Sequence, residues 1–122
     1  MLRLKWVKCK GNKWSNLMRL ALSKIDASGV YVIWCVEQAP VCLRVGSGTI
    51  RERLSDHRND PEVTEYRHLG LRVTWAAVHP SQQLGVEAFL AERLVPLYGE
   101  RFPDRTPIQV NPPEPFCPED SS

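Results

Sequence analysis

Apolar residues cluster in short runs that predict a β-sheet. Residues 30–36 (VYVIWCV) and 41–45 (VCLRV) are rich in β-branched and aromatic residues, and the four residues 37–40 separate them. This arrangement predicts a β-hairpin with a four-residue loop. The first run is apolar on both faces, which is typical of a strand in the middle of a sheet. Residues 71–78 (LRVTWAAV) predict a third strand.

Before the hairpin, the pattern changes to helical spacing. Residues 16–25 (NLMRLALSKI) follow Ser15, a suitable helix N-cap, and carry apolar residues on one side. They predict a helix that residues 26–29 (DASG) end. Residues 2–8 (LRLKWVK) alternate apolar and basic positions and are interpreted as a short strand or an extended arm.

After the hairpin, two further helices are expected. Residues 46–49 (GSGT) are expected to break the second strand, and residues 49–60 predict a helix with Ile50 and Leu54 on its inner side. Residues 85–99 (GVEAFLAERLVPLYG) predict a longer helix. Its expected inner face consists of Val86, Phe89, Leu90, Arg93 and Leu94.

Together these elements predict a single α+β domain, a small three-stranded antiparallel or mixed sheet flanked by helices. Its expected parts are a basic arm with a helix (residues 1–28), the main domain (residues 29–111) and a tail (residues 112–122). The tail is rich in proline and acid and is expected to be disordered. A length of 122 residues, 43% of them hydrophobic, is enough for one modest core.

Charge and cysteine content exclude several classes of protein. The net charge is only +2, and the chain lacks the run of about 18 apolar residues that a membrane span needs. The charged start of the chain does not match a signal peptide, so a soluble cytoplasmic protein is expected. The four cysteines form no Cys-x-x-Cys pair, which argues against a zinc site or a disulfide scaffold.

The basic residues are concentrated at the start of the chain. Residues 1–24 carry seven Lys or Arg and no acid, interleaved with Trp6 and Trp14. This mixture suits contacts with phosphates and bases of nucleic acid. The alternative, at least as well supported by the sequence, is a solvated basic face whose tryptophans cover the core.

The hairpin and the two helices after it offer groups suited to phosphodiester hydrolysis. Tyr31 and Arg44 lie on the predicted strands, Arg53 and His57 are one turn apart on a helix, and Glu87 begins the next helix. An arginine matches phosphate geometry, and a single carboxylate can anchor Mg²⁺. Each residue also has an ordinary alternative role: a core tyrosine, a solvated arginine, a capping histidine or a first-turn acid.

The order of these residues resembles the GIY-YIG nuclease family. Gly29-Val30-Tyr31 matches the first tripeptide of that family, and Arg44-Val45-Gly46 matches the second at its valine and glycine. The segments GSGTIRERLSDH and GVEAFLAERLVPLYG look like the helices that bear the family's Arg, His and Glu. Asn111 is similar to the asparagine that closes many members.

The resemblance implies a function and a role for each residue. Tyr31 would be the general base, Arg53 the phosphate-stabilising cation, His57 its helper and Glu87 the single ligand of Mg²⁺ or Mn²⁺. Asn111 would support the site from the C-terminal end. Members of the family cut DNA in repair, restriction and recombination, so a DNA substrate, branched or damaged, is expected. A stand-alone domain would read DNA shape or borrow specificity from a protein partner.

Arg44 departs from the family, because a tyrosine is expected there. By strand alternation it shares a face with Cys42, opposite Leu43 and Val45. One hypothesis is that Arg44 binds phosphate or lowers the pKa of Tyr31; another is that it pairs with Asp56 or Glu52. The first favours an active endonuclease. The loss of the tyrosine favours a catalytically silent module that binds nucleic acid or protein, and a purely structural domain is a third possibility.

Overall fold

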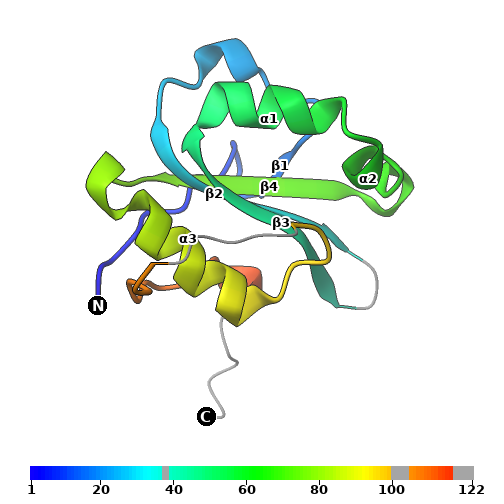
Figure 1. Ribbon diagram of the computed structural model, residues 1–122. Coiled ribbons are helices and arrows are strands. Elements are labelled where there is room, and N and C mark those ends of the chain that lie inside the picture. Colours follow the sequence, from blue (N-terminus) through cyan, green and yellow to red (C-terminus); the bar gives the residue numbers. More distant parts are fainter. Residues whose placement is uncertain (37–38, 100–104, 117–122) are drawn as a thin grey trace.

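The computed structural model of the chain describes residues 1–36, 39–99 and 105–116 (Figure 1). Within them the strands are β1 (Ser15–Asn16), β2 (Ser28–Val36), β3 (Pro40–Thr49) and β4 (Leu71–Ala77). The α-helices are α1 (Ile50–Arg58), α2 (Pro61–Thr64) and α3 (Pro80–Leu94). Short 3-10 helices are η1 (Leu22–Lys24), η2 (Arg67–Leu69) and η3 (Glu114–Phe116). The predicted α+β class is confirmed.

The strands form one antiparallel sheet in the order β1-β4-β2-β3. β2 lies in its middle, and the run from Gly29 to Cys35 is buried. This burial explains why its sequence is apolar at consecutive positions rather than at alternate ones. The prediction of three strands is wrong, because the short strand β1 pairs with β4 and adds a fourth.

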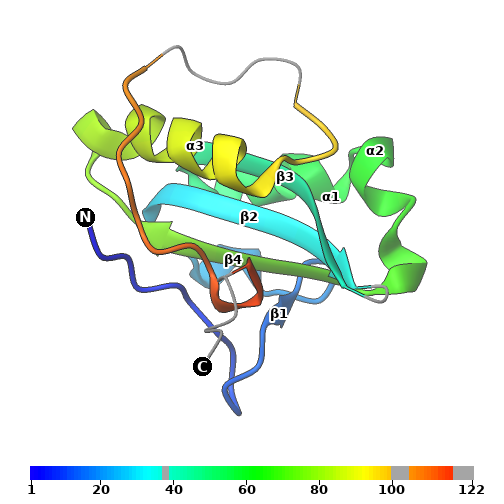
Figure 2. The ribbon, with the colours of Figure 1, turned by 90° about the horizontal axis from the view of Figure 1, so that it is seen from below.

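Two layers cover the sheet, one on each face. The side chains of Tyr31 and Ile33 pack with Ile50 and Leu54 of α1 on one face, and Val30 and Val32 pack with α3 on the other. Figures 1 and 2 show α1 and α3 on opposite sides of the sheet, with the N-terminal arm and residues 105–116 beside α3. The β2 side chains therefore alternate between two cores.

The predicted helix over residues 16–25 is wrong. Its start forms β1, and the side chain of Asn16 accepts a hydrogen bond from the Met18 amide at 2.9 Å. Arg58 of α1 donates to the carbonyl oxygens of Leu17, at 2.7 Å, and of Leu20. Since a helix would need such carbonyl oxygens for its own ladder, these side-chain bonds stabilise the irregular path instead.

The hairpin forms as predicted, but β3 is longer than expected. Residues 46–49, expected to break the strand, continue it to Thr49 and pair with the start of β2. Glycine fits this part of the strand because the side chains of Tyr31 and Arg53 occupy the space that a Cβ atom at Gly46 or Gly48 would need. The register shifts between Ile33 and Trp34, which marks a β-bulge in β3. Part of the predicted loop, residues 37–38, lies outside the described residues.

The two later helices have bounds different from those expected. α1 buries Ile50 and Leu54 as predicted. α3 begins at Pro80, five residues early, because Pro suits the first helical turn, and His79 accepts a hydrogen bond from the Ser81 amide. It ends at Leu94, where Val95 takes a left-handed conformation before a proline.

α3 also presents a narrower inner face than the sequence predicts. Val86 and Leu90 are buried, but Arg93 is exposed, and Phe89 and Leu94 are only half-buried.

The segment 112–116, for which the sequence pattern predicts disorder, packs against the domain. It forms η3, and the ring of Phe116 packs edge-on against Trp34 at a centroid distance of 5.8 Å. An aromatic contact with the core outweighs the disorder tendency of proline and acid. Residues 117–122 lie outside the described part. None of the helices in the described ranges combines the length and apolar character needed to cross a membrane.

Candidate active site

Tyr31 reaches the outer edge of the sheet from its central strand. It pairs with Gly46 of β3, and its ring lies over that residue. A Cβ atom at Gly46 would be 2.2 Å from the Tyr31 Oη atom, so only glycine leaves room for the phenol. Tyr31 is only 4% exposed. The missing side chain at Gly46 is therefore what brings a core tyrosine to the rim of the molecule.

His57 holds the other side of the Tyr31 hydroxyl. The Tyr31 Oη atom and the His57 Nε2 atom are 2.6 Å apart, a short hydrogen bond, and the histidine is buried. His57 lies in the last turn of α1, four residues after Arg53. On its far side, the His57 Nδ1 atom faces the Asp60 Oδ2 atom at 3.8 Å.

Glu87 approaches the same place from the opposite layer. It lies on α3, half-buried, and its Oε1 atom accepts a hydrogen bond of 2.7 Å from the Ser47 hydroxyl. Ser47 pairs with Val30, whose side chain is on the α3 face. The site thus wraps around β3, the edge strand, with Tyr31 on one side and Glu87 on the other.

One pocket of ≈ 300 Å³ joins these groups. Its wall includes Tyr31, Arg44, Ser47, Arg53 and Glu87. His57 is not in the wall but stands behind Tyr31, so it contacts the pocket only through the phenol. The pocket therefore combines a hydroxyl pair, two guanidinium groups and one carboxylate, a set that can bind a phosphate anion and a cation together.

The protonation of the Tyr31–His57 pair follows from burial and charge. Burial raises the pKa of Tyr31 to about 12, although Arg44 and Arg53 oppose this, and Glu87 and Asp56 add to it. Burial, followed by Arg44, lowers the pKa of His57 to about 4, against Asp60 and Asp56. At neutral pH the pair is therefore a neutral phenol beside a neutral imidazole.

The carboxyl group of Glu87 is less acidic than usual. Burial raises its pKa, while the Ser47 hydrogen bond and the charge of Arg53 act in the opposite direction. A bound cation would favour the ionised form of this carboxyl group. Glu87 and the Ser47 hydroxyl are the oxygen ligands available to a metal ion here.

The donor set fits an ion that keeps most of its water. Within the described ranges, no group of three or more His, Cys, Asp or Glu residues is placed to hold a metal. Mg²⁺ and Mn²⁺ are commonly held by one or two carboxylates, with water and substrate phosphate supplying the other ligands. A single carboxylate beside two arginines suits that mode.

Arg44 is in the pocket, but its strand neighbours differ from the prediction. It pairs with Ile33, on the Tyr31 face, while Cys42 pairs with Trp34 on the α3 face. Leu43 is the extra residue of the bulge, so the alternation predicted between Cys42 and Arg44 is broken. None of the ion pairs among the residues that the structure describes involves Arg44, so the suggested partners Asp56 and Glu52 do not hold it.

Asn111 is not brought into this cluster. Its side chain accepts from the Leu4 amide at 2.6 Å and donates to the Leu4 carbonyl at 2.9 Å. Its own carbonyl accepts from the indole of Trp6 at 2.9 Å. Asn111 therefore fastens the N-terminal arm to residues 105–116, on the α3 side of the sheet, and is absent from the pocket wall.

Ser47 and Asp60 contact residues of the site but are not predicted from the sequence. Ser47 lies in a segment expected to be a turn, and only the continuation of β3 gives it a face. Asp60 precedes Pro61, and an Asp-Pro pair is typical of a helix start, which would have located the short helix α2. Compared with protein-family models, curated proteins and solved structures, the chain matches nothing.

Proposed function

We propose that this protein is a metal-dependent endonuclease that hydrolyses phosphodiester bonds in DNA. The observation that carries the proposal is the convergence of Tyr31, Arg44, Arg53 and Glu87 on one pocket of ≈ 300 Å³. These residues come from a central strand, an edge strand and two helices, and no packing requirement alone would gather them. The order of the motifs, similar to that of GIY-YIG nucleases, supports the same proposal.

Each side chain has a distinct task. Arg44 and Arg53 bind the phosphate and balance the negative charge that grows on its oxygens. Tyr31 accepts a proton from the attacking water. Glu87, with the Ser47 hydroxyl, would hold Mg²⁺ or Mn²⁺. Such an ion, when bound, stabilises the charge on the leaving oxygen.

Tyr31 works as a base only together with His57. With a pKa of about 12, on the order of one phenol in 10⁵ is ionised at pH 7. A free phenolate is therefore too scarce to carry the reaction. The short distance of 2.6 Å between Tyr31 Oη and His57 Nε2 supports a relay instead. As Tyr31 takes the proton of water, its own proton passes to His57.

The test is a cleavage assay with plasmid, single-stranded and branched DNA, in Mg²⁺ or Mn²⁺. Tyr31→Phe and Glu87→Gln should each lower the cleavage rate by about 10²-fold or more, because they remove the base and the metal ligand. Tyr66→Phe is the matched control, since its hydroxyl contacts Tyr98 and it is absent from the pocket wall. Cleavage that persists in both site variants comes from a contaminant and contradicts the proposal.

The same assay decides on the second candidate, a silent module that binds nucleic acid. The raised pKa of Tyr31 and the lowered pKa of His57 favour this candidate, because a protonated phenol can bind phosphate but activates water only if His57 takes up its proton. DNA binding by the unmutated protein without cleavage, weakened by Arg53→Gln, would establish it in place of the endonuclease.

A further inference from the structure

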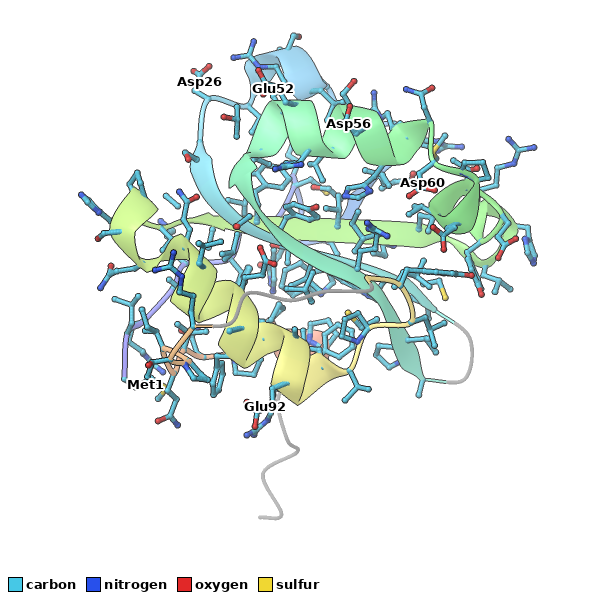
Figure 3. All side chains as sticks on the ribbon, viewed as in Figure 1. Met1, Asp26, Glu52, Asp56, Asp60 and Glu92 are labelled. Carbon is cyan, nitrogen blue, oxygen red and sulfur yellow. The ribbon has the colours of Figure 1, made fainter. Side chains whose placement is uncertain are left out.

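Asp60 stands where α1 passes into α2, and its two carboxylate oxygens face different groups. The Oδ1 atom accepts the Glu62 amide at 3.0 Å, which caps α2. The Oδ2 atom faces the Nδ1 atom of His57 at 3.8 Å. Figure 3 labels Asp60 at this junction. One oxygen is thus used by the helix cap, and the other is directed at the histidine behind Tyr31.

The position of this carboxylate bears on which nitrogen of His57 carries the proton. A neutral imidazole has one N–H and one bare nitrogen, and the hydrogen-bond setting of one fixes the other. A carboxylate attracts an N–H and repels a bare nitrogen. At 3.8 Å the Asp60–His57 contact is longer than a hydrogen bond, so it acts through charge, which a buried histidine senses strongly.

Other charged groups besides Asp60 act on His57, and the charge of Arg44 has the largest effect. Arg44, Arg53 and Asp56 also act on His57 through their charge. Among the described residues, Asp60 is the acidic group that forms an ion-pair contact with the imidazole, and that contact is made at Nδ1. Tyr31, the partner at Nε2, is neutral and either donates or accepts. The side that decides the tautomer is therefore the Nδ1 side.

We propose that Asp60 is a positioning residue that keeps the proton of His57 on Nδ1, so that Tyr31 is the donor in the Tyr31–His57 hydrogen bond. Tyr31 Oη then has its lone pairs free toward the pocket, and Nε2 is bare and ready to accept the Tyr31 proton. The catalytic value of this arrangement rests on the proposed nuclease function, but the tautomer itself does not. After the transfer, the imidazolium formed faces the Asp60 carboxylate.

The decisive variant is Asp60→Asn, measured by ¹⁵N NMR of the imidazole nitrogens at pH 7.5 in the full chain. Asparagine keeps the oxygen that caps α2 and turns an NH₂ group toward Nδ1. The unmutated protein should show a protonated Nδ1 and a bare Nε2 at His57, and Asp60→Asn should reverse them. His57→Gln assigns the signals against His68 and His79.

Asp56→Asn is the matched control, because it removes the same charge from a residue of α1 that forms no ion pair with His57 in the described structure. It should leave the His57 tautomer unchanged. Asp60→Ser, which also retains a capping oxygen, serves as a second variant if Asp60→Asn does not fold; it should yield a mixture of both tautomers. A protonated Nε2 in the unmutated protein, or an unchanged tautomer in both Asp60 variants, would overturn the proposal.

Cleavage kinetics separate this proposal from the nuclease proposal. If the protein cuts DNA, Asp60→Asn should lower kcat on the order of 10-fold to 100-fold with little change in KM, because Asp60 does not line the pocket. An unchanged kcat in Asp60→Asn would contradict the positioning role. If the unmutated protein does not cut DNA, the nuclease function fails, and the NMR result still decides what Asp60 does.

Discussion

At the residue scale, Arg44 is the side chain whose role changes most once its position is known. It lies in the wall of the pocket, on the Tyr31 face of the sheet, and it affects both members of the Tyr31–His57 pair. A positive charge favours the phenolate and disfavours the imidazolium, so Arg44 lowers the pKa of both groups. In the place of the expected tyrosine, it contributes charge rather than a hydroxyl.

Arg44→Gln should therefore raise the pKa of His57 above its value of about 4 and raise the pKa of Tyr31 as well. The His57 pKa can be measured by NMR titration between about pH 3.5 and pH 7, a range set by its ordinary value and its burial. The cleavage rate at neutral pH should fall, because phosphate binding becomes less favourable.

Arg51→Gln is the control for this prediction. Arg51 lies on the exposed side of α1, where its guanidinium is 3.5 Å from Asp26, and it does not line the pocket. It should change neither titration nor rate. If Arg44→Gln behaves like Arg51→Gln, Arg44 has no electrostatic role in the site.

Residue type and spacing predict most of the residues that meet at the pocket. Tyr31, Arg53 and Glu87 were expected to share a site and do line one pocket, with His57 in contact with Tyr31. Arg53 and His57 are four residues apart on α1, and such a local spacing can be predicted from the sequence. The position of Asn111 depends on how two distant segments pack, which no local pattern encodes, and the structure places it outside the pocket wall.

At the element scale, the edge strand β3 determines the shape of the site. Residues 97–98 cover its outer edge at the bulge, with amide hydrogen bonds to the carbonyls of Cys42 and Leu43. The next residues, from Arg44 to Ser47, line the pocket instead. An edge strand normally leaves backbone groups unpaired. Residues 97–98 therefore cover one part of the β3 edge, and the other part is open toward the pocket.

Gly46→Ala tests the role of this strand. A Cβ atom there would clash with the Oη and Cζ atoms of Tyr31, at 2.2 Å and 2.4 Å, so Tyr31 or the strand must shift. We expect a loss of about 1–3 kcal/mol in the free energy of unfolding, measured by chemical denaturation, with a loss of DNA cleavage.

A double-mutant cycle with Tyr31→Leu separates the clash from other effects of the alanine. Leucine lacks the atoms that a Cβ at position 46 would meet, so Gly46→Ala should cost clearly less in that background. An equal cost in both backgrounds would show that the phenol does not occupy the space above Gly46.

Sequence periodicity predicted β2, β4 and α1 because each buries a regular pattern of side chains. It failed where other interactions outweigh periodicity. The predicted helix after Ser15 is replaced by irregular chain, since Arg58 hydrogen bonds with its carbonyl oxygens. The expected break at residues 46–49 is a continuous strand, because glycine there is required by a neighbour rather than by a turn.

At the scale of the whole molecule, the two ends of the described chain hold each other. Leu2 forms a parallel bridge with Val110, and Asn111 binds both backbone groups of Leu4. Lys8 forms an ion pair with Glu114 at 3.1 Å and lies over the Trp14 ring. The basic arm is therefore at least partly a structural cover for the α3 core, as one of the two interpretations of its sequence proposed.

Asn111→Ala should destabilise the arm without impairing the site. The loss of two hydrogen bonds with the Leu4 backbone should cost about 1–3 kcal/mol, and amide exchange at Leu4 should become faster. Cleavage by the folded variant should keep its kcat, because Asn111 does not line the pocket. A lost activity with intact folding would return Asn111 to the site.

The bulge in β3 also keeps Cys35 and Cys42, the two thiols of the hairpin, from forming a disulfide with each other. By placing one extra residue at Leu43, it turns Cys42 toward the α3 core while Cys35 faces the α1 core. Thiols directed to opposite faces of a sheet cannot be bridged unless the backbone moves. Burial also raises the pKa of Cys42 to about 12, so that its reactive thiolate is scarce. An oxidising environment should therefore leave the register of these two strands, and with it the alignment of Tyr31 and Gly46, unchanged.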